Sequence, residues 1–181
     1  MSIYCLGDSN TYGYDPRSYC GDRYNENCRW VDLLSKKTGK HITNGGINGQ
    51  KIPRTSVFIP NETDFLIVML GTNDLLQGAD TETVALRMER FLKTLPSSLP
   101  VLLIAPPSLQ KGAWVTDENL ITASQALGSY YRALSTEMEM HFTDAAAWDL
   151  PLCFDGVHFT EEGHVKFAQQ LSHLLFEILN T

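Results

Sequence analysis

The sequence lacks the features that mark several broad classes of protein. Among its 181 residues no run of lysine and arginine exceeds a pair such as Lys36 and Lys37, and the formal charge is −7. A nucleic-acid-binding surface needs a basic stripe, so we expect no nucleic-acid partner. The longest apolar stretch, residues 65–70, has the length of a strand and is too short to cross a bilayer. We therefore expect no membrane partner.

Cysteines are few, and their spacing indicates neither a metal site nor a disulfide scaffold. The four of them, Cys5, Cys20, Cys28 and Cys153, show neither CxxC spacing nor the density of a disulfide scaffold. We expect reduced thiols, and a pairing of Cys20 with Cys28 stays open for an exported chain. No secretory signal precedes the strand-like sequence that begins at Ser2, so a cytoplasmic location is expected.

The composition and the pattern of the chain favour one globular α/β domain over residues 1–181. Hydrophobic residues make up 43% of the chain and charged residues 19%, which is ordinary for a folded domain. Apolar β-favouring runs predict strands over 2–6, 41–44, 65–70, 101–105 and 140–144. Helical stretches between them cover 29–37, 81–95, 117–138 with a break considered at Gly128, and a last helix from an N-cap at Thr160 toward 179.

The alternation of strands and helices indicates how the chain is arranged. It predicts a mainly parallel sheet of five strands that is covered on both faces, in a three-layer α/β/α sandwich. Right-handed crossovers favour a flavodoxin-like strand order, 2-1-3-4-5. No internal repeat or linker interrupts this pattern.

Polar and glycine-rich segments follow the first four predicted strands. They are GDSN (7–10), NGGINGQ (44–50), GTND (71–74) and APPS (105–108). Turn chemistry explains each of them taken singly. Ligands of such sheets bind beyond the carboxyl ends of the strands, so together these segments predict one site at that edge.

Ser9 is a candidate nucleophile in the first of these segments, and it needs a general base. His158 lies in DGVHF, the segment after the last strand, and Asp155 precedes it by three residues. An acid there would accept a hydrogen bond from one ring nitrogen and fix the tautomer. The remaining histidines lie before strands or within the last helix: His41, His141, His164 and His173.

Acyl transfer also needs hydrogen-bond donors for an oxyanion. The loops offer the Ser9 backbone N–H, a backbone N–H of the pair Gly45 and Gly46, and the side-chain amide of Asn73. Glycine suits such a role because the missing Cβ lets the backbone approach the reacting carbon.

Four ordered motifs, GDS (7–9), NGG (44–46) with NG (48–49), GTND (71–74) and DGVH (155–158), resemble the sequence blocks of the SGNH (GDSL-type) hydrolase superfamily over roughly residues 3–170. The resemblance implies that Ser9 is the nucleophile, His158 the base and Asp155 its partner. It also implies an oxyanion hole made by Ser9, Gly46 and Asn73, and an acyl-enzyme mechanism without cofactor or metal.

A finer similarity points to the bacterial arylesterase-like lipase/acylhydrolase branch. GDSNTYGYDP, NGGINGQK and LLIAPPSL are similar to that group, although Gly45 stands where an acid is common there. No inserted domain or long lid is apparent, so small acyl esters (acetyl to butyryl, or aryl) are the expected substrates. Trp30 is expected in the core, and we predict substrate contacts from Asn10, Tyr12, Trp114 and Phe154.

Several alternatives stay open at this point. A carbohydrate O-deacetylase or an acyltransferase would use the same site, and a catalytically silent binding protein would share the fold. A Cys153 nucleophile and a homo-oligomer are also compatible with the sequence. The sequence contains no nucleotide-binding loop and no zinc-protease motif. It also lacks the acidic cluster and the lysine that a receiver domain needs.

Overall fold

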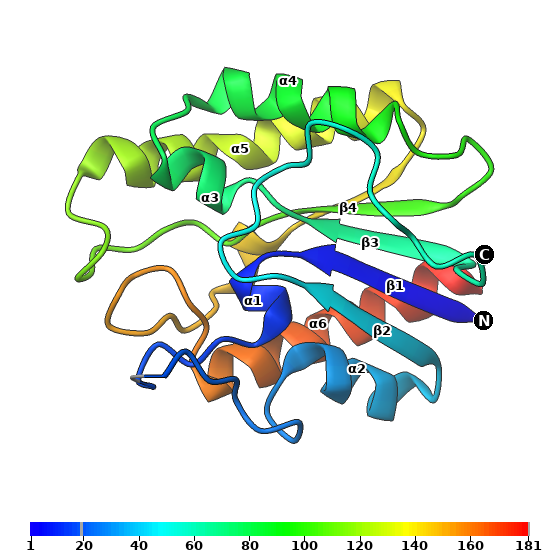
Figure 1. Cartoon of the computed structure of the whole chain (residues 1–181), viewed down its shortest axis with the longest axis horizontal. Coiled ribbons are helices and arrows are strands. Elements are labelled where there is room, and N and C mark those ends of the chain that lie inside the picture. Colours follow the sequence, from blue (N-terminus) through cyan, green and yellow to red (C-terminus); the bar gives the residue numbers. More distant parts are fainter. Residues whose placement is uncertain (19, 181) are drawn as a thin grey trace.

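A parallel β-sheet forms the centre of the computed structural model, which describes residues 1–18 and 20–180. Within them the five strands lie in the order β2-β1-β3-β4-β5, and every neighbouring pair is parallel (Figure 1). Their bounds are β1 Ser2–Gly7, β2 His41–Gly46, β3 Phe65–Met69, β4 Val101–Ala105 and β5 His141–Asp144. The predicted fold class and strand order are thereby confirmed.

Helices cover both faces of this sheet (Figure 1). One face packs against α2 (Trp30–Thr38) and α6 (Glu161–Leu179), and the other against α4 (Thr81–Leu92) and α5 (Glu118–Glu137). Every residue of β3 and β4 is buried as a result, which is why these two strands are apolar without alternation. Trp30, the first residue of α2, is fully buried in the core, as predicted.

Short helices begin where strands end at the carboxyl edge of the sheet. They are α1 (Ser9–Tyr12) after β1, α3 (Thr72–Leu76) after β3 and the 3₁₀ turn η1 (Ala145–Trp148) after β5. Asp8 caps α1, since its carboxylate accepts a hydrogen bond from the Asn10 N–H at 3.0 Å. None of the three was predicted, because one turn is too short to show a helical period.

The long helices differ from the sequence prediction in small ways. Helix α5 continues through Gly128, where a Cβ would lie 2.1 Å from the Asp144 carboxylate, so glycine lets the helix pass close to the end of β5. Thr160 caps α6 as predicted, with its side chain accepting from the Gly163 N–H at 3.0 Å. Of the helices in residues 1–18 and 20–180, none has an apolar stretch long enough to cross a membrane.

Candidate active site

Ser9 lies at the first turn of α1, directly beyond the carboxyl end of β1. Gly7 ends the strand, and a Cβ there would lie 2.0 Å from the Thr11 hydroxyl, so the turn from β1 into α1 is tight. The Ser9 side chain is buried, and its Oγ lies 2.9 Å from Nε2 of His158. This is hydrogen-bond distance for transfer of the hydroxyl proton to the imidazole.

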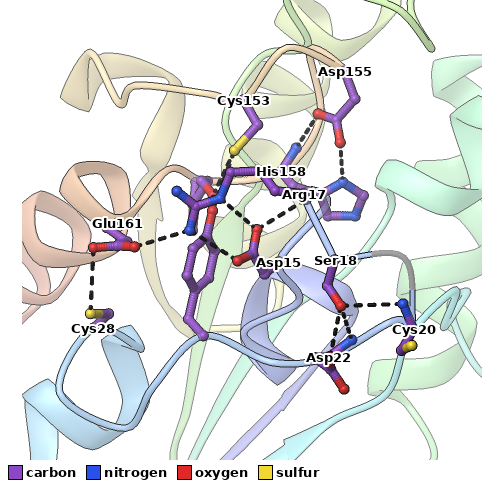
Figure 2. Close-up of polar contacts among 12 residues, drawn as sticks. Asp15, Arg17, Ser18, Cys20, Asp22, Cys28, Cys153, Asp155, His158 and Glu161 are labelled. Carbon is purple, nitrogen blue, oxygen red and sulfur yellow. Dashed lines mark hydrogen bonds and ion pairs between the residues drawn. The ribbon is translucent and has the colours of Figure 1, made fainter.

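The opposite nitrogen of the His158 ring faces Asp155. Nδ1 lies 2.7 Å from one Asp155 oxygen, and the other oxygen accepts the backbone N–H of His158 at 3.0 Å (Figure 2). The same oxygen also accepts the backbone N–H of Val157 at 2.9 Å. Burial acts to raise the pKa of Asp155, but these hydrogen bonds outweigh it and hold that pKa below its ordinary value. An ionised Asp155 accepts a hydrogen bond from the Nδ1–H group. The other ring nitrogen, Nε2, then carries no proton and can accept the one from Ser9.

The structure therefore brings together three residues that are far apart in the sequence. Ser9 comes from the end of β1, whereas Asp155 and His158 come from the segment between η1 and α6. The hydrogen bonds run from hydroxyl to imidazole to carboxylate, which is the geometry of a nucleophile, a base and an orienting acid.

A hollow of about 300 Å³ opens beside the Ser9 hydroxyl. Two aromatic rings meet His158 edge-on at its mouth, Tyr14 with a centroid distance of 4.7 Å and Trp114 at 5.3 Å. The hollow is lined by Ser9, Tyr14, Asn48, Gly49, Asn73, Leu76, Trp114, Val157 and His158. It is small and largely apolar, with a few polar groups near the nucleophile.

The loop that carries Trp114 is attached to the loop that carries Asp155. Three backbone N–H groups donate across to carbonyl oxygens: Gln110 to Gly156 (3.0 Å), Ala113 to Phe154 (2.9 Å) and Trp114 to Asp155 (3.1 Å). Gly112 permits this approach, because a Cβ there would lie 2.4 Å from the Asp155 carbonyl carbon. The two loops thus form one backbone unit beside the hollow.

Gly46 does not reach the hollow, contrary to its predicted oxyanion role. It ends β2 in register with Gly7, and its N–H donates to the Asn44 side chain at 2.9 Å. A Cβ on Gly46 would lie 2.1 Å from the Tyr12 nitrogen, so glycine is needed there for the packing of α1 on β2.

Gly49 lies in the hollow where Gly46 was expected. Its φ is +72°, a region that favours glycine. In the part of the chain that the structure describes, the Gly49 N–H has no hydrogen-bond partner. The motif NGGINGQ contained this residue, but the sequence does not show which glycine follows the end of the strand.

Asn73 lines the hollow from the first turn of α3. Its amide nitrogen donates to the Gln50 carbonyl at 3.1 Å and has a long contact of 3.5 Å with the Asp8 carboxylate. Burial raises the pKa of Asp8 to about 6. Because the bond to Gln50 is short and the contact with Asp8 is long, one N–H of Asn73 is firmly held and the other only weakly.

Of the four predicted substrate-binding residues, one lines the hollow. Trp114 does so, with 54% of its surface exposed. Asn10 is buried with both ends of its amide hydrogen-bonded, Tyr12 packs under the Arg23 guanidinium at 4.3 Å, and Phe154 is 62% exposed outside the lining. Tyr14, two residues beyond Tyr12, takes the place at the mouth that Tyr12 was expected to have.

The alternative base and nucleophile have no access to the hollow. His164 is a buried residue in the first turns of α6, where burial lowers its pKa to about 3, and its Nδ1 accepts the Trp30 N–H at 3.4 Å. Cys153 has its sulfur 3.4 Å from the Tyr24 hydroxyl, and burial raises the pKa of this thiol. Neither residue lines the hollow.

An ion-pair network fastens the loop before α2 to the start of α6. Arg17 bridges Asp15 at 2.9 Å and Glu161 at 3.0 Å, and the Cys28 thiol donates to Glu161 at 3.8 Å (Figure 2). Cys20 and Cys28 are free thiols. Across residues 1–18 and 20–180, no three histidine, cysteine or acidic side chains are arranged to hold a metal ion.

Comparisons with known proteins identify a family and several solved structures that this chain resembles. A model of the GDSL-like lipase/acylhydrolase family matches residues 5–166. A putative arylesterase from Agrobacterium tumefaciens has 25% identity and a TM-score of 0.85, with 98% of this chain and 99% of that chain covered. A search among curated protein sequences finds no significant match.

Two further solved structures share the fold at lower identity. An inhibitor-bound aryl esterase of M. smegmatis has 23% identity and a TM-score of 0.85, with 97% of this chain and 98% of that chain covered. Est24, a carbohydrate acetylesterase from Sinorhizobium meliloti, has 22% identity and a TM-score of 0.81, with 98% and 99% covered.

Proposed function

We propose a function from one premise, that the chain belongs to the GDSL-like lipase/acylhydrolase family. Membership makes it a hydrolase of the esterase type. Within that class, we propose a serine carboxylic ester hydrolase that cleaves small acyl esters through an acyl-enzyme. The observation that carries this proposal is the hydrogen-bonded series from Ser9 through His158 to Asp155, with Ser9 facing the hollow.

The proposed reaction begins with attack of the Ser9 oxygen on the ester carbonyl. The hydroxyl proton passes to Nε2 of His158, and Asp155 stabilises the imidazolium that forms. His158 then gives this proton to the leaving alcohol as the ester C–O bond breaks, which leaves the acyl group on Ser9. Water attacks the acyl-enzyme with His158 again as the base. The bond from the acyl carbon to the Ser9 oxygen then breaks, His158 returns the proton to that oxygen, and the acid is released.

Three donors would stabilise the oxyanion in this reaction. The Ser9 N–H belongs to the first turn of α1, where backbone N–H groups have no partner within the helix. The Gly49 N–H is the second. The third is the Asn73 N–H that makes only the 3.5 Å contact with Asp8, because that weak contact costs little to exchange for a developing negative charge.

The size and lining of the hollow support small substrates. About 300 Å³ accommodates a short acyl or aryl group, and the side chains of Tyr14, Leu76 and Trp114 give it an apolar wall. An acetylated sugar is the second candidate, since Trp114 offers an exposed ring at the mouth and Asn48 a polar group inside. The same acyl-enzyme would pass its acyl group to a sugar or alcohol in an acyltransferase.

Two measurements test this function. A fluorophosphonate reagent is expected to label the wild type on Ser9, as located by mass spectrometry, and Ser9→Ala is expected to lose ester turnover while it keeps the fold. An adduct on Cys153 would end the serine mechanism.

A substrate panel tests the proposed specificity. We expect p-nitrophenyl acetate to butyrate to be cleaved far better than long-chain esters, and acetylated sugars in the same panel separate the two candidates. The ratio of hydrolysis to transfer, measured with an added alcohol acceptor, separates a hydrolase from an acyltransferase. Robust cleavage of long-chain esters would contradict the small hollow.

A further inference from the structure

We propose that Asn10 is a positioning residue that fastens the helix of the nucleophile to the loop of the base, an inference that rests on the proposed function of Ser9 and His158. Asn10 follows Ser9 in α1 and was predicted from the sequence to contact substrate. Only 4% of its surface is exposed. Its amide is directed into the protein, toward the segment that holds His158.

The Asn10 amide bonds the backbone on both sides of His158. Its Nδ2 donates to the Val157 carbonyl at 3.0 Å, and its Oδ1 accepts the Phe159 N–H at 2.9 Å. The partners fix the orientation of the amide, because a carbonyl needs the NH₂ end and an N–H needs the oxygen end. One side chain thus holds the two peptide groups that flank the base.

Asn10 is itself held at both of its backbone groups. Its N–H donates to the Asp8 carboxylate at 3.0 Å, and its carbonyl accepts the indole N–H of Trp30 at 2.9 Å. Because Trp30 is fully buried, α1 is anchored to the core at this residue. The amide therefore extends from a fixed point.

The loop of His158 has other hydrogen bonds, some of them to residues 110–114 and to the Tyr24 hydroxyl, but among the described residues only the Ser9–His158 contact also reaches α1. Asp155 accepts the N–H groups of Val157 and His158, and the Cys153 N–H donates to the His158 carbonyl at 2.7 Å. These bonds join residues within one loop, so they shape it without setting its distance from Ser9. The two bonds of Asn10 join segments about 150 residues apart, and this distance is the one they set.

The expected consequence is a loss of rate rather than of binding. The Ser9–His158 contact of 2.9 Å is the contact through which the proton moves, and a displacement near 1 Å is enough to cost about 10²-fold in rate. A substrate contact at Asn10 would instead change KM and leave the reactivity of Ser9 unaltered.

Asn10→Leu tests this, because leucine has a similar size and makes neither bond; Asn10→Ala serves if leucine does not fit. For both we expect kcat on p-nitrophenyl acetate and the rate of labelling by a small fluorophosphonate to fall together by about 10–100-fold, with KM within about twofold. Ile67→Val is the control, since Ile67 is fully buried in β3 away from the site. It should lower Tm by about 2–4 °C with kcat unchanged.

Each other outcome has a definite meaning. A lower Tm with wild-type kcat and labelling in the Asn10 variants would overturn the positioning role, and so would a raised KM with unchanged labelling. If the wild type were not labelled at Ser9, or if Ser9→Ala kept its turnover, the proposed function would fail whatever the Asn10 variants did.

Discussion

Two histidines lie six residues apart, both buried and both flanked by aromatic rings, yet they occupy different chemical surroundings. His158 lies at the carboxyl edge of the sheet between Tyr14 and Trp114. His164 lies in the first turns of α6 between Tyr24 and Phe159, with ring centroids at 5.3 and 5.1 Å. Burial and aromatic contact are therefore common to both regions.

The partners of the ring nitrogens make the difference. His158 has a carboxylate at 2.7 Å on one nitrogen and a hydroxyl at 2.9 Å on the other. His164 has a backbone N–H at 3.4 Å on Nδ1, and its Nε2 has no partner among the residues that the structure describes. Without an acid, burial keeps His164 neutral, helped by the nearby His158 and Arg29, and its pKa is lowered to about 3. Partners on both nitrogens distinguish a candidate base from a packed histidine.

The largest expected effect comes from removing the His158 ring, with removal of the His164 ring as the comparison. His158→Ala should lower kcat by about 10⁴–10⁶-fold, since the proton of Ser9 then has no acceptor. His164→Leu should leave kcat per folded molecule within about threefold, because this ring has no contact with the hollow. Steady-state kinetics on both variants decides the matter, and a crippled His164→Leu beside an active His158→Ala would reverse the comparison.

The acid that His164 lacks should account for the next largest effect. In Asp155→Asn the amide would donate to Nδ1, place the ring proton on Nε2 and so remove the acceptor that Ser9 needs. We expect kcat to fall by about 10⁴-fold, with KM little changed. The rate is measured as a function of pH. Circular dichroism on the same preparation checks that the fold persists. Wild-type kcat would show that Asp155 only shapes its loop.

Asn73→Ala should have an intermediate effect, confined to the edge that contains His158. If its amide meets the oxyanion, kcat should fall by about 10²–10³-fold with little change in KM. A turn asparagine would instead cost about 1 kcal/mol of stability with kcat unaltered. Measuring kcat and Tm together separates these roles.

A smaller effect should appear in the acid stability of the region around His164. Its pKa is about 3 in the fold and 6.5 as a reference, so the unfolded chain binds the proton first as pH falls. The neutral ring contributes stability that is present above pH 6.5 and is lost toward pH 3. His164→Leu should therefore reduce the fall of Tm between pH 6.5 and 4. An identical pH dependence in wild type and variant would contradict the buried neutral ring.

The smallest effect should come from Asp8, with the opposite sign. Its pKa is raised from 3.8 to about 6, so the protonated acid contributes stability that is present below pH 3.8 and is lost as pH rises through about 6. Asparagine caps a helix equally well. Asp8→Asn should have a higher Tm than wild type at pH 8, and the difference should vanish near pH 4. A lower Tm at pH 8 would mean that the charge stabilises this edge.

The sequence predicted the strand order and the grouping of Ser9, His158 and Asp155. Each strand, and the loop that follows it, can be recognised from a short stretch of sequence. The sequence did not distinguish Gly49 from Gly46. That choice depends on where β2 stops pairing with β1 and on the Asn44 side chain that takes the Gly46 N–H. The role of Asn10 was missed for a similar reason, since its partners lie about 150 residues away.

The loop of Trp114 and the loop of Asp155, joined by three backbone hydrogen bonds and the close approach of Gly112, have a consequence for motion. A loop that opened to admit substrate would have to break those bonds or carry Asp155 with it. Entry should therefore involve rotation of the Trp114 side chain over a still backbone. In hydrogen–deuterium exchange, the amides of Gln110, Ala113 and Trp114 should exchange as slowly as those of a sheet, although they lie in a loop.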